Sequence, residues 1–294
     1  MFNKESAFAR NLGFLSHEEQ EKINQSTVAI AGAGGDGGAL ALQLARLGFE
    51  EIRLADPDPF EVENINRQAV CTTETVGVNK AQAVADYLHK INPNIKTPLY
   101  TEGVTESNVE DFLDNADLLI DETEFTLHSL GVMLARTARA KGIPNLMALN
   151  IGFGATVTTY HPEGVTLEKN LGLSETAPLS EIATTEVSLS RWLPYIPNYG
   201  DINVLKKVSD GEKSAPSIAP GVAMAASVAS TQALLNILHG QNNRKKPIYA
   251  PRTIVIDAMS LDSKIIRYPR LNHYSNLGNL VIRNLLHKSP RASY

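Results

Sequence analysis

The chain has 294 residues, of which 43% are hydrophobic and 20% charged, which is ordinary for a globular protein with one large α/β domain or two small ones. No apolar run reaches about eighteen residues and the N-terminus lacks the apolar core of a signal peptide, so neither a membrane span nor a secretory leader is expected. One cysteine leaves no internal disulfide and no paired-cysteine zinc site, and it favours a reducing, cytoplasmic compartment.

The charge is unevenly distributed. Residues 244–294 contain ten Lys and Arg against two acids, a net charge of +8, so the first 243 residues carry −13 within the total of −5. A basic C-terminal segment is compatible with an acidic partner or a nucleic acid. The alternative is that it folds back on the acidic body of its own protein or of a second copy.

A nucleotide-binding βαβ unit is predicted near the N-terminus. Residues 8–26 are expected to form a helix capped by Ser16, and Val28–Ile30 to form a strand. A glycine turn, a helix and a second strand ending at Asp56 follow; the turn contains Gly32, Gly34, Gly35, Asp36 and Gly37. Glycines let the backbone approach a phosphate, and the helix N-terminus offers free N–H donors. Asp56, nineteen residues after Gly37, stands where a carboxylate accepts hydrogen bonds from ribose hydroxyls. The alternative is a tight structural turn.

The residues after Asp56 favour a triphosphate over a dinucleotide. They include Asp58, Asn64, Arg67, Gln68 and Lys80. A dinucleotide site neutralises its pyrophosphate largely with backbone dipoles, whereas a triphosphate that releases pyrophosphate needs fixed cations and a metal. The alternative for Arg67 and Lys80 is an ion pair with Asp56, Asp58 or Glu61.

These motifs and spacings resemble the ubiquitin-activating-type adenylating enzymes, the ThiF/MoeB/HesA superfamily, most closely over residues 8–160. The resemblance implies a homodimer that uses ATP and Mg²⁺. It implies that Asp56 holds the ribose and the glycine loop the phosphates, with Asp58 and Gln68 beside them. It also implies that Asn64, Arg67 and Lys80 neutralise and orient the phosphates. Arg10 stands near the position of an arginine that reaches the γ-phosphate from the partner subunit; the alternative is a solvated helix charge.

Three departures from the family pattern bear on activity. Glu124 occupies the position of the usual metal-binding aspartate, with Asp121 as a substitute ligand for Mg²⁺. His128 stands where an arginine is common. Asp36 replaces an aliphatic residue of the glycine loop. An acid there is stabilised by the helix dipole but repels a nearby phosphate. These changes indicate either variation around a working site or a weakened ATP site.

Alternating strands and helices predict a mainly parallel, Rossmann-like sheet with helices on both faces. We divide the chain into an N-terminal helical segment (1–26), a nucleotide-binding domain (27–161), and residues 162–294, a C-terminal crossover lobe and antiparallel extension packed on the same domain. The expected C-terminal elements are a partly helical stretch at Glu186–Leu193, a long helix at Ser217–Leu238, strands at Thr253–Asp257 and Lys264–Tyr268, and a helix at Gly278–His287.

The predicted chemistry is attack of a carboxylate on the α-phosphorus of ATP, which needs no general base because the nucleophile is already ionised. Cys71 is expected to be a small buried residue, so the reaction should stop at the acyl-adenylate. The expected substrate is the C-terminus of a ubiquitin-like or sulfur-carrier protein or of a peptide. Three alternatives stay open: a tRNA-modifying dehydratase of the same superfamily, an NAD-binding dehydrogenase, and a non-catalytic scaffold.

Overall fold

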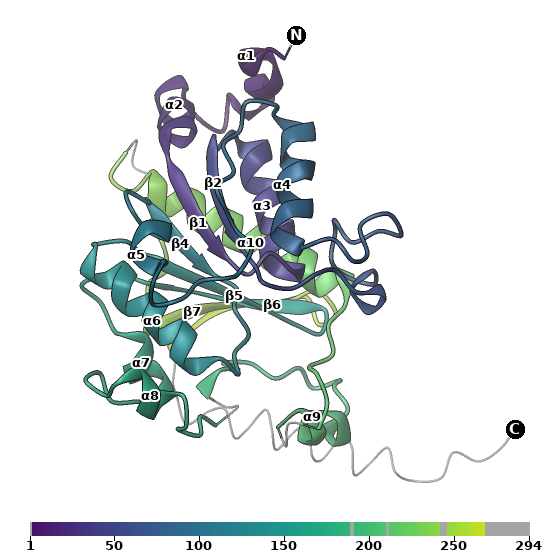
Figure 1. Ribbon diagram of the computed structural model, residues 1–294, viewed down its shortest axis with the longest axis vertical. Coiled ribbons are helices and arrows are strands. Elements are labelled where there is room, and N and C mark those ends of the chain that lie inside the picture. The colour runs from purple at the N-terminus through teal and green to yellow at the C-terminus, as the bar shows by residue number, and fades with distance from the viewer. Residues whose placement is uncertain (1, 189–190, 210–211, 242–245, 268–294) are drawn as a thin grey trace, which may run out of the picture.

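The computed structural model describes residues 2–188, 191–209, 212–241 and 246–267. Within them, one eight-stranded sheet has the order β3-β2-β1-β4-β5-β6-β7-β8 (Figure 1). The first five strands in this order are parallel, and β5 to β8 are antiparallel neighbours. The strands are β1 (Thr27–Ala31), β2 (Glu51–Ala55), β3 (Leu99–Tyr100), β4 (Leu118–Asp121), β5 (Asn145–Ile151), β6 (Gly154–Tyr160), β7 (Arg252–Asp257) and β8 (Asp262–Arg267).

The helices fall into an N-terminal group, a group that covers the sheet, and a group in the crossover lobe. They are α1 (Lys4–Phe8), α2 (His17–Gln25), α3 (Gly35–Leu47), α4 (Lys80–Ile91), α5 (Val109–Phe112), α6 (His128–Ala140), α7 (Leu167–Leu171), α8 (Leu179–Ile182), α9 (Ile202–Ser209) and α10 (Ala219–Ile237), with 3-10 turns at Ala9–Asn11 and Val62–Asn64.

Helices cover both faces of the parallel part of the sheet, as predicted. Successive side chains of a strand point to opposite faces. In β1, Val28 and Ile30 belong to a core formed with α3, α4 and α10, whereas Ala29 and Ala31 belong to a second core formed with α5 and α6. The larger β1 side chains therefore face the three-helix layer, and the small ones admit α6 on the other side.

The N-terminal segment lies at the C-terminal end of α3. Helix α2 begins after Ser16, whose hydroxyl accepts the Glu19 N–H while the Glu19 carboxylate accepts the Ser16 N–H. The predicted cap is thus confirmed, but the single helix over 8–26 is wrong, because Gly13 adopts a φ of +106° and breaks it. The Gln20 side-chain amide donates to the Leu47 carbonyl at 2.9 Å. This contact fixes the segment to the last turn of α3.

The crossover lobe is attached to α6 and to the sheet. Arg136 of α6 contacts the Glu168 carboxylate at 2.7 Å and donates to the Ala177 carbonyl at 2.8 Å. Among the described residues of Glu186–Leu193 none is α-helical and Arg191 lies in a 3-10 turn, while residues 189–190 of this expected, partly helical stretch lie outside the described residues. Trp192 is buried there and stacks on His128, which shows that tertiary contacts hold this stretch. The expected helix at Gly278–His287 lies outside the described residues.

A buried carboxylate joins the lobe to the end of β7. The Asp257 carboxylate accepts hydrogen bonds from the hydroxyls of Tyr195 (3.1 Å) and Tyr199 (2.9 Å), and burial raises the pKa of both tyrosines. The Tyr199 hydroxyl also accepts the Phe153 N–H at 2.8 Å, in the turn between β5 and β6.

Among the described residues, no helix combines the length and apolar character needed to cross a membrane.

We predict that Tyr199→Phe destabilises the protein, because it leaves the Phe153 N–H without its acceptor and removes a donor from Asp257. The expected loss is about 1–3 kcal/mol of unfolding free energy, measured by denaturant titration. Tyr87→Phe, which alters a more exposed tyrosine on α4, is the matched control. Equal stability of the two variants would contradict the proposed attachment.

Candidate nucleotide site

The glycine loop runs against the end of β4, and two of its glycines leave no room for a side chain. Gly32 has a φ of +96°, and a Cβ there would collide with the backbone carbonyl of Glu122. A Cβ at Gly37 would collide with the carbonyl of Gly32. Glycine is therefore required at both positions for backbone geometry. The loop also places the N-terminus of α3 at the carboxyl edge of the sheet, where ligands bind in open α/β folds.

Two further glycines admit neighbouring segments. A Cβ at Gly34 would lie 3.5 Å from the Gln68 side-chain oxygen, and one at Gly35 would lie 3.4 Å from a Val222 methyl group of α10. Gln68 and the first turn of α10 thus border the loop directly. The Gln68 side-chain oxygen is buried and has no hydrogen-bond partner within the described structure.

Asp56 at the end of β2 holds the glycine loop in place. One carboxylate oxygen accepts the Ala33 N–H at 2.8 Å and the other accepts the Asp58 N–H at 2.9 Å. Burial raises the pKa of Asp56, while these hydrogen bonds and Lys80 oppose that rise. Asp56 therefore shapes the loop, and its contact with a ribose stays a prediction.

Lys80 lies beside this carboxylate as the first residue of α4. Its Nζ is 3.0 Å from the Asp58 carboxylate and 4.0 Å from that of Asp56, and its side chain is only 13% exposed. The structure thus has the ion pair that the sequence offered as the alternative to phosphate binding. The two interpretations are compatible, since Asp58 is largely exposed and can yield the cation to a phosphate.

The asparagine and arginine of the motif occupy one short loop. The Asn64 side-chain oxygen accepts the Glu61 N–H at 3.0 Å, so this residue shapes the loop. Arg67 donates to the Glu63 carbonyl at 3.0 Å and to the Asn66 side chain at 2.9 Å. In the described part of the chain Arg67 forms no ion pair, so its charge is available at the edge of the site.

The two predicted metal ligands lie in different environments. Glu124 is exposed and accepts only a long 3.4 Å hydrogen bond from Thr126. Asp121 is buried; one oxygen accepts the Thr123 N–H and hydroxyl, and the other lies 3.5 Å from the Cβ position of Gly131 on α6. No group of three or more potential metal ligands occurs among the described residues. Glu124 is the freer carboxylate for an ion that nucleotide phosphates also coordinate.

Two further carboxylates, those of Glu122 and Asp36, lie at this edge of the sheet, and the sequence did not predict that they come together there. Strand β5 continues beyond its pairing with β4, which ends at Ile120 and Leu146. Glu122 accepts the Ala148 N–H at 3.0 Å, and Asp36 accepts the Asn150 N–H at 3.0 Å. Burial raises the pKa of both side chains, to about 6 for Asp36. Asp36 stood out in the sequence as a departure, whereas the sequence contains no signal that distinguishes Glu122 from its acidic neighbours.

The remaining singled-out residues are not gathered at the loop. Arg10 belongs to the segment at the opposite end of α3, roughly 20 Å from the glycine loop for a helix of 13 residues. Cys71 is buried, donates to the Glu61 carbonyl at 3.4 Å, and has a thiol pKa raised by burial, as a small core residue would. Burial also lowers the pKa of His128.

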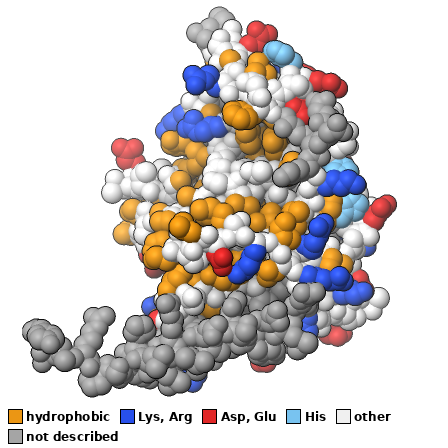
Figure 2. All heavy atoms as spheres, turned by 180° about the vertical axis from the view of Figure 1, so that it is seen from behind, with side chains coloured by type: hydrophobic (Ala, Val, Ile, Leu, Met, Phe, Trp, Pro, Cys, Tyr) orange, Lys and Arg blue, Asp and Glu red, His pale blue; other side chains and the backbone are white. Residues whose placement is uncertain are grey.

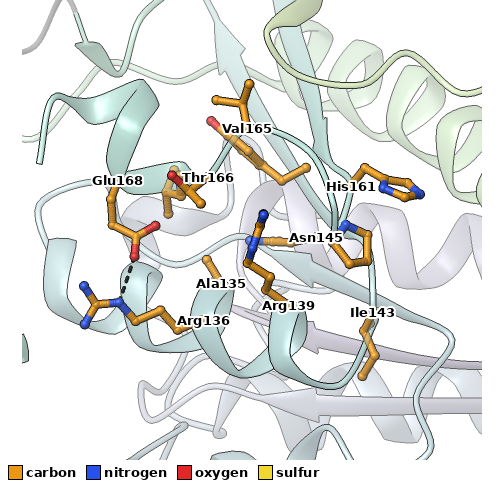
Figure 3. A pocket seen from close by; sticks show the side chains of 12 residues that line it. Ala135, Arg136, Arg139, Ile143, Asn145, His161, Val165, Thr166 and Glu168 are labelled. Atoms are coloured by element: carbon orange, nitrogen blue, oxygen red, sulfur yellow. Dashed lines mark hydrogen bonds and ion pairs between the residues drawn. The ribbon is translucent and has the colours of Figure 1, made fainter. Parts of the chain in front are cut away.

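A small hollow lies away from the glycine loop, between α6 and the chain after β6. Figure 3 shows Arg139, Asn145 and His161 around it, with Arg136 paired to Glu168. Arg139 donates to the Gly164 carbonyl at 3.0 Å, and the cavity holds about 30 Å³. It contains no residue of the glycine loop. At this size it accommodates water rather than a nucleotide.

The sheet order and its helices define an α/β protein of the Rossmann type. The family model described as "ThiF family" matches residues 8–277, so the chain belongs to the ThiF family. It is 30% identical over 160 residues to "Adenylyltransferase and sulfurtransferase UBA4" of Debaryomyces hansenii, which covers 51% of this chain and 36% of that protein. It is also 30% identical over 148 residues to "SAMP-activating enzyme E1" of Haloferax volcanii, which covers 50% of this chain and 54% of that protein.

Solved structures share the fold over most of the chain. MccB of E. coli with AMPCPP and the MccA peptide has a TM-score of 0.66 at 19% identity, and covers 92% of this chain and 73% of that one. PaaA has a TM-score of 0.64 at 22% identity, and the match covers 92% of this chain and 77% of that one. The chain spans about a third to a half of the length of the two curated relatives above.

We predict a pH-dependent stabilisation by Asp36→Asn. Burial raises the pKa of Asp36 from 3.8 to about 6, so ionisation is less favourable in the folded chain. The stability that this carboxyl contributes is therefore lost as the pH rises through about 6. The melting temperature of the variant relative to wild type should be higher at about pH 7.5 than at about pH 5. The exposed Asp114→Asn is the control, and an identical difference at both pH values would contradict the prediction.

Proposed function

We propose that this protein is an ATP- and Mg²⁺-dependent adenylyltransferase that activates a carboxylate as an acyl-adenylate and releases pyrophosphate. The observation that carries the proposal is the placement of Lys80 beside Asp56, while Asp56 fixes the glycine loop through the Ala33 N–H. A cation, a loop of backbone donors and a helix N-terminus thus meet at one edge of the sheet. The family membership and the relatives named as adenylyltransferases support it.

The reaction needs positioning and charge neutralisation rather than proton transfer. An ionised carboxylate attacks the α-phosphorus, the bond to the bridging oxygen of pyrophosphate breaks, and the electron pair leaves with pyrophosphate. Lys80 and Arg67 would neutralise charge that builds up on the phosphate oxygens, and backbone N–H groups at the start of α3 would orient them. Asp56 would keep the glycine loop fixed and accept hydrogen bonds from the ribose hydroxyls.

Glu124 would hold Mg²⁺ at the end of β4, with Asp121 as the second candidate. When bound, the ion would supply positive charge that offsets the negative charge of the phosphates and of the leaving pyrophosphate. The carboxylate of Glu124 fits this role because it is exposed and hydrogen-bonded only weakly to Thr126. Acidic oxygen donors are the type that Mg²⁺ prefers.

The proposed substrate is the C-terminal carboxylate of a ubiquitin-like or sulfur-carrier protein or of a peptide. Two similar proteins support this class of substrate. One is MccB, whose structure contains MccA, and the other is the enzyme named for activating SAMP. The buried, protonated Cys71 favours release of the acyl-adenylate to an outside nucleophile. The basic segment 244–294 keeps a tRNA substrate as the second proposal, and most of that segment lies outside the described residues.

We predict that Lys80→Ala lowers exchange of labelled pyrophosphate into ATP by on the order of 10²-fold or more, since a preorganised charge is lost. The assay uses candidate small proteins or peptides encoded beside the gene, and calorimetry with α,β-methylene-ATP measures nucleotide binding separately. Lys90→Ala, an exposed lysine of the same helix, is the control. Unchanged exchange in Lys80→Ala would exclude the mechanism.

We further propose a homodimer in which Arg10 completes the site of the partner subunit, because within its own chain it lies at the far end of α3. Arg10→Ala and Lys80→Ala should each be inactive. Refolded together in equal amounts, about half of the dimers are mixed and contain one intact site, so activity should recover to roughly a quarter of wild type. No recovery despite proven subunit exchange would exclude the role of Arg10 in the partner's site.

A further inference from the structure

A chain of hydrogen bonds crosses from the glycine loop to the start of α10. One oxygen of the Asp36 carboxylate accepts both the Asn150 N–H (3.0 Å) and the Asn150 side-chain N–H (2.8 Å). The Asn150 side-chain oxygen in turn accepts the Ser217 hydroxyl at 2.7 Å. Asn150 therefore uses its side-chain donor on α3 and its side-chain acceptor on the segment that enters α10.

A third segment is bound to the same point. The side-chain amide of Asn66, the residue before Arg67, donates to the Ser217 carbonyl at 3.0 Å. A few residues further along, a Val222 methyl group lies 3.4 Å from the position that a Cβ at Gly35 would take, so the first turn of α10 is next to the loop. Residue 217 is thus held from both sides, by the end of β5 and by the motif loop, directly next to the nucleotide loop.

The position of Asp36 explains why an acid replaces the aliphatic residue expected there. Because β5 runs beyond β4, its Asn150 N–H has no strand partner on that side, and a buried unpartnered donor is costly. The Asp36 carboxylate provides the acceptor. Two charged side chains lie near Asp36. The charge of Arg67 lowers the pKa of Asp36, and the charge of Asp36 raises the pKa of Glu122.

We propose that Asp36, Asn150 and Ser217 form a positioning relay that holds Ser217 and the first turn of α10 beside the glycine loop. Occupancy of the loop by a nucleotide would thereby be coupled to the placement of Ser217 and that turn. This inference rests on the proposed function, because the coupled ligand is the nucleotide. The three residues act through one another and on the backbone, and none is assigned a contact with the reacting atoms.

The consequence concerns the carboxylate substrate. In-line attack requires the nucleophile to be held within a narrow range of positions relative to the α-phosphorus. Ser217 is bound to Asn150 and Asn66, and the first turn of α10 borders the loop that would hold the phosphates, so fixing this point would orient the approach of the acyl group. In this interpretation Asp36 is a positioning residue, and its presence is not a sign of a degenerate ATP site.

The test is amide hydrogen exchange of the full chain with and without α,β-methylene-ATP and Mg²⁺, followed in peptides covering 32–38 and 212–222. In wild type the nucleotide should slow exchange in both peptides. Ser217→Ala and Asp36→Leu should each speed exchange in 212–222 by roughly fivefold without nucleotide, as the loss of a hydrogen bond predicts. With nucleotide, these variants should show slowing in 32–38 only.

Conservative variants supply the controls. Ser217→Thr keeps the hydroxyl, and Asp36→Asn keeps a side-chain oxygen that can accept both hydrogen bonds, so neither should show the faster exchange in 212–222 expected of Ser217→Ala and Asp36→Leu. Wild-type exchange in 212–222 of Asp36→Leu would overturn the relay, since that substitution lies in another element. If wild type bound no nucleotide, the proposed function would fail, and the nucleotide-free comparison would still decide whether the relay exists.

Discussion

The passage of the chain from β1 into α3 depends on close backbone contacts that exclude any Cβ. Gly32 lies against the carbonyl of Glu122, and Gly37 lies against the carbonyl of Gly32. These contacts bring the N-terminus of α3 down onto the carboxyl ends of β1 and β4. Because the helix starts there, its free N–H groups, the Asp56 carboxylate and Lys80 converge on one edge of the sheet. A side chain at either glycine would lift the helix and disperse this set.

Acidic side chains are abundant at this edge, yet a triphosphate carries negative charge. The structure gives most of these acids backbone partners, and Lys80 in addition pairs with Asp58 at 3.0 Å and lies 4.0 Å from Asp56. Asp36 and Glu122 accept N–H groups of β5, and Asp56 accepts N–H groups of the loop. Arg67 and Lys80 stay partly exposed. The carboxylates therefore act as structural acceptors, while the cations are left to face a ligand.

The antiparallel half of the sheet connects the crossover lobe to this edge. Asp257 binds two tyrosines of the lobe, and the turn between β5 and β6 is fixed by Tyr199. Helix α10 returns from the lobe and packs on α3, where Ser230 donates to the Gln43 side chain at 2.7 Å. Figure 2 shows a face on which apolar side chains are interspersed with Lys and Arg. The lobe and the nucleotide loop are thus parts of one packed unit.

The sequence by itself determined the βαβ unit, the parallel sheet with helices on both faces and the family, because glycine spacing and apolar periodicity are local properties. The motif spacing that resembles the family also grouped Asp56 with Lys80, and the structure places the Lys80 Nζ 4.0 Å from the Asp56 carboxylate. Only the tertiary structure decided what Asp36 does, because its partner Asn150 is 114 residues away. The same holds for Trp192, whose burial against His128 no local residue pattern predicts. Such contacts depend on where β5 ends relative to β4 and on how the lobe folds back, and local residue patterns carry no information about either.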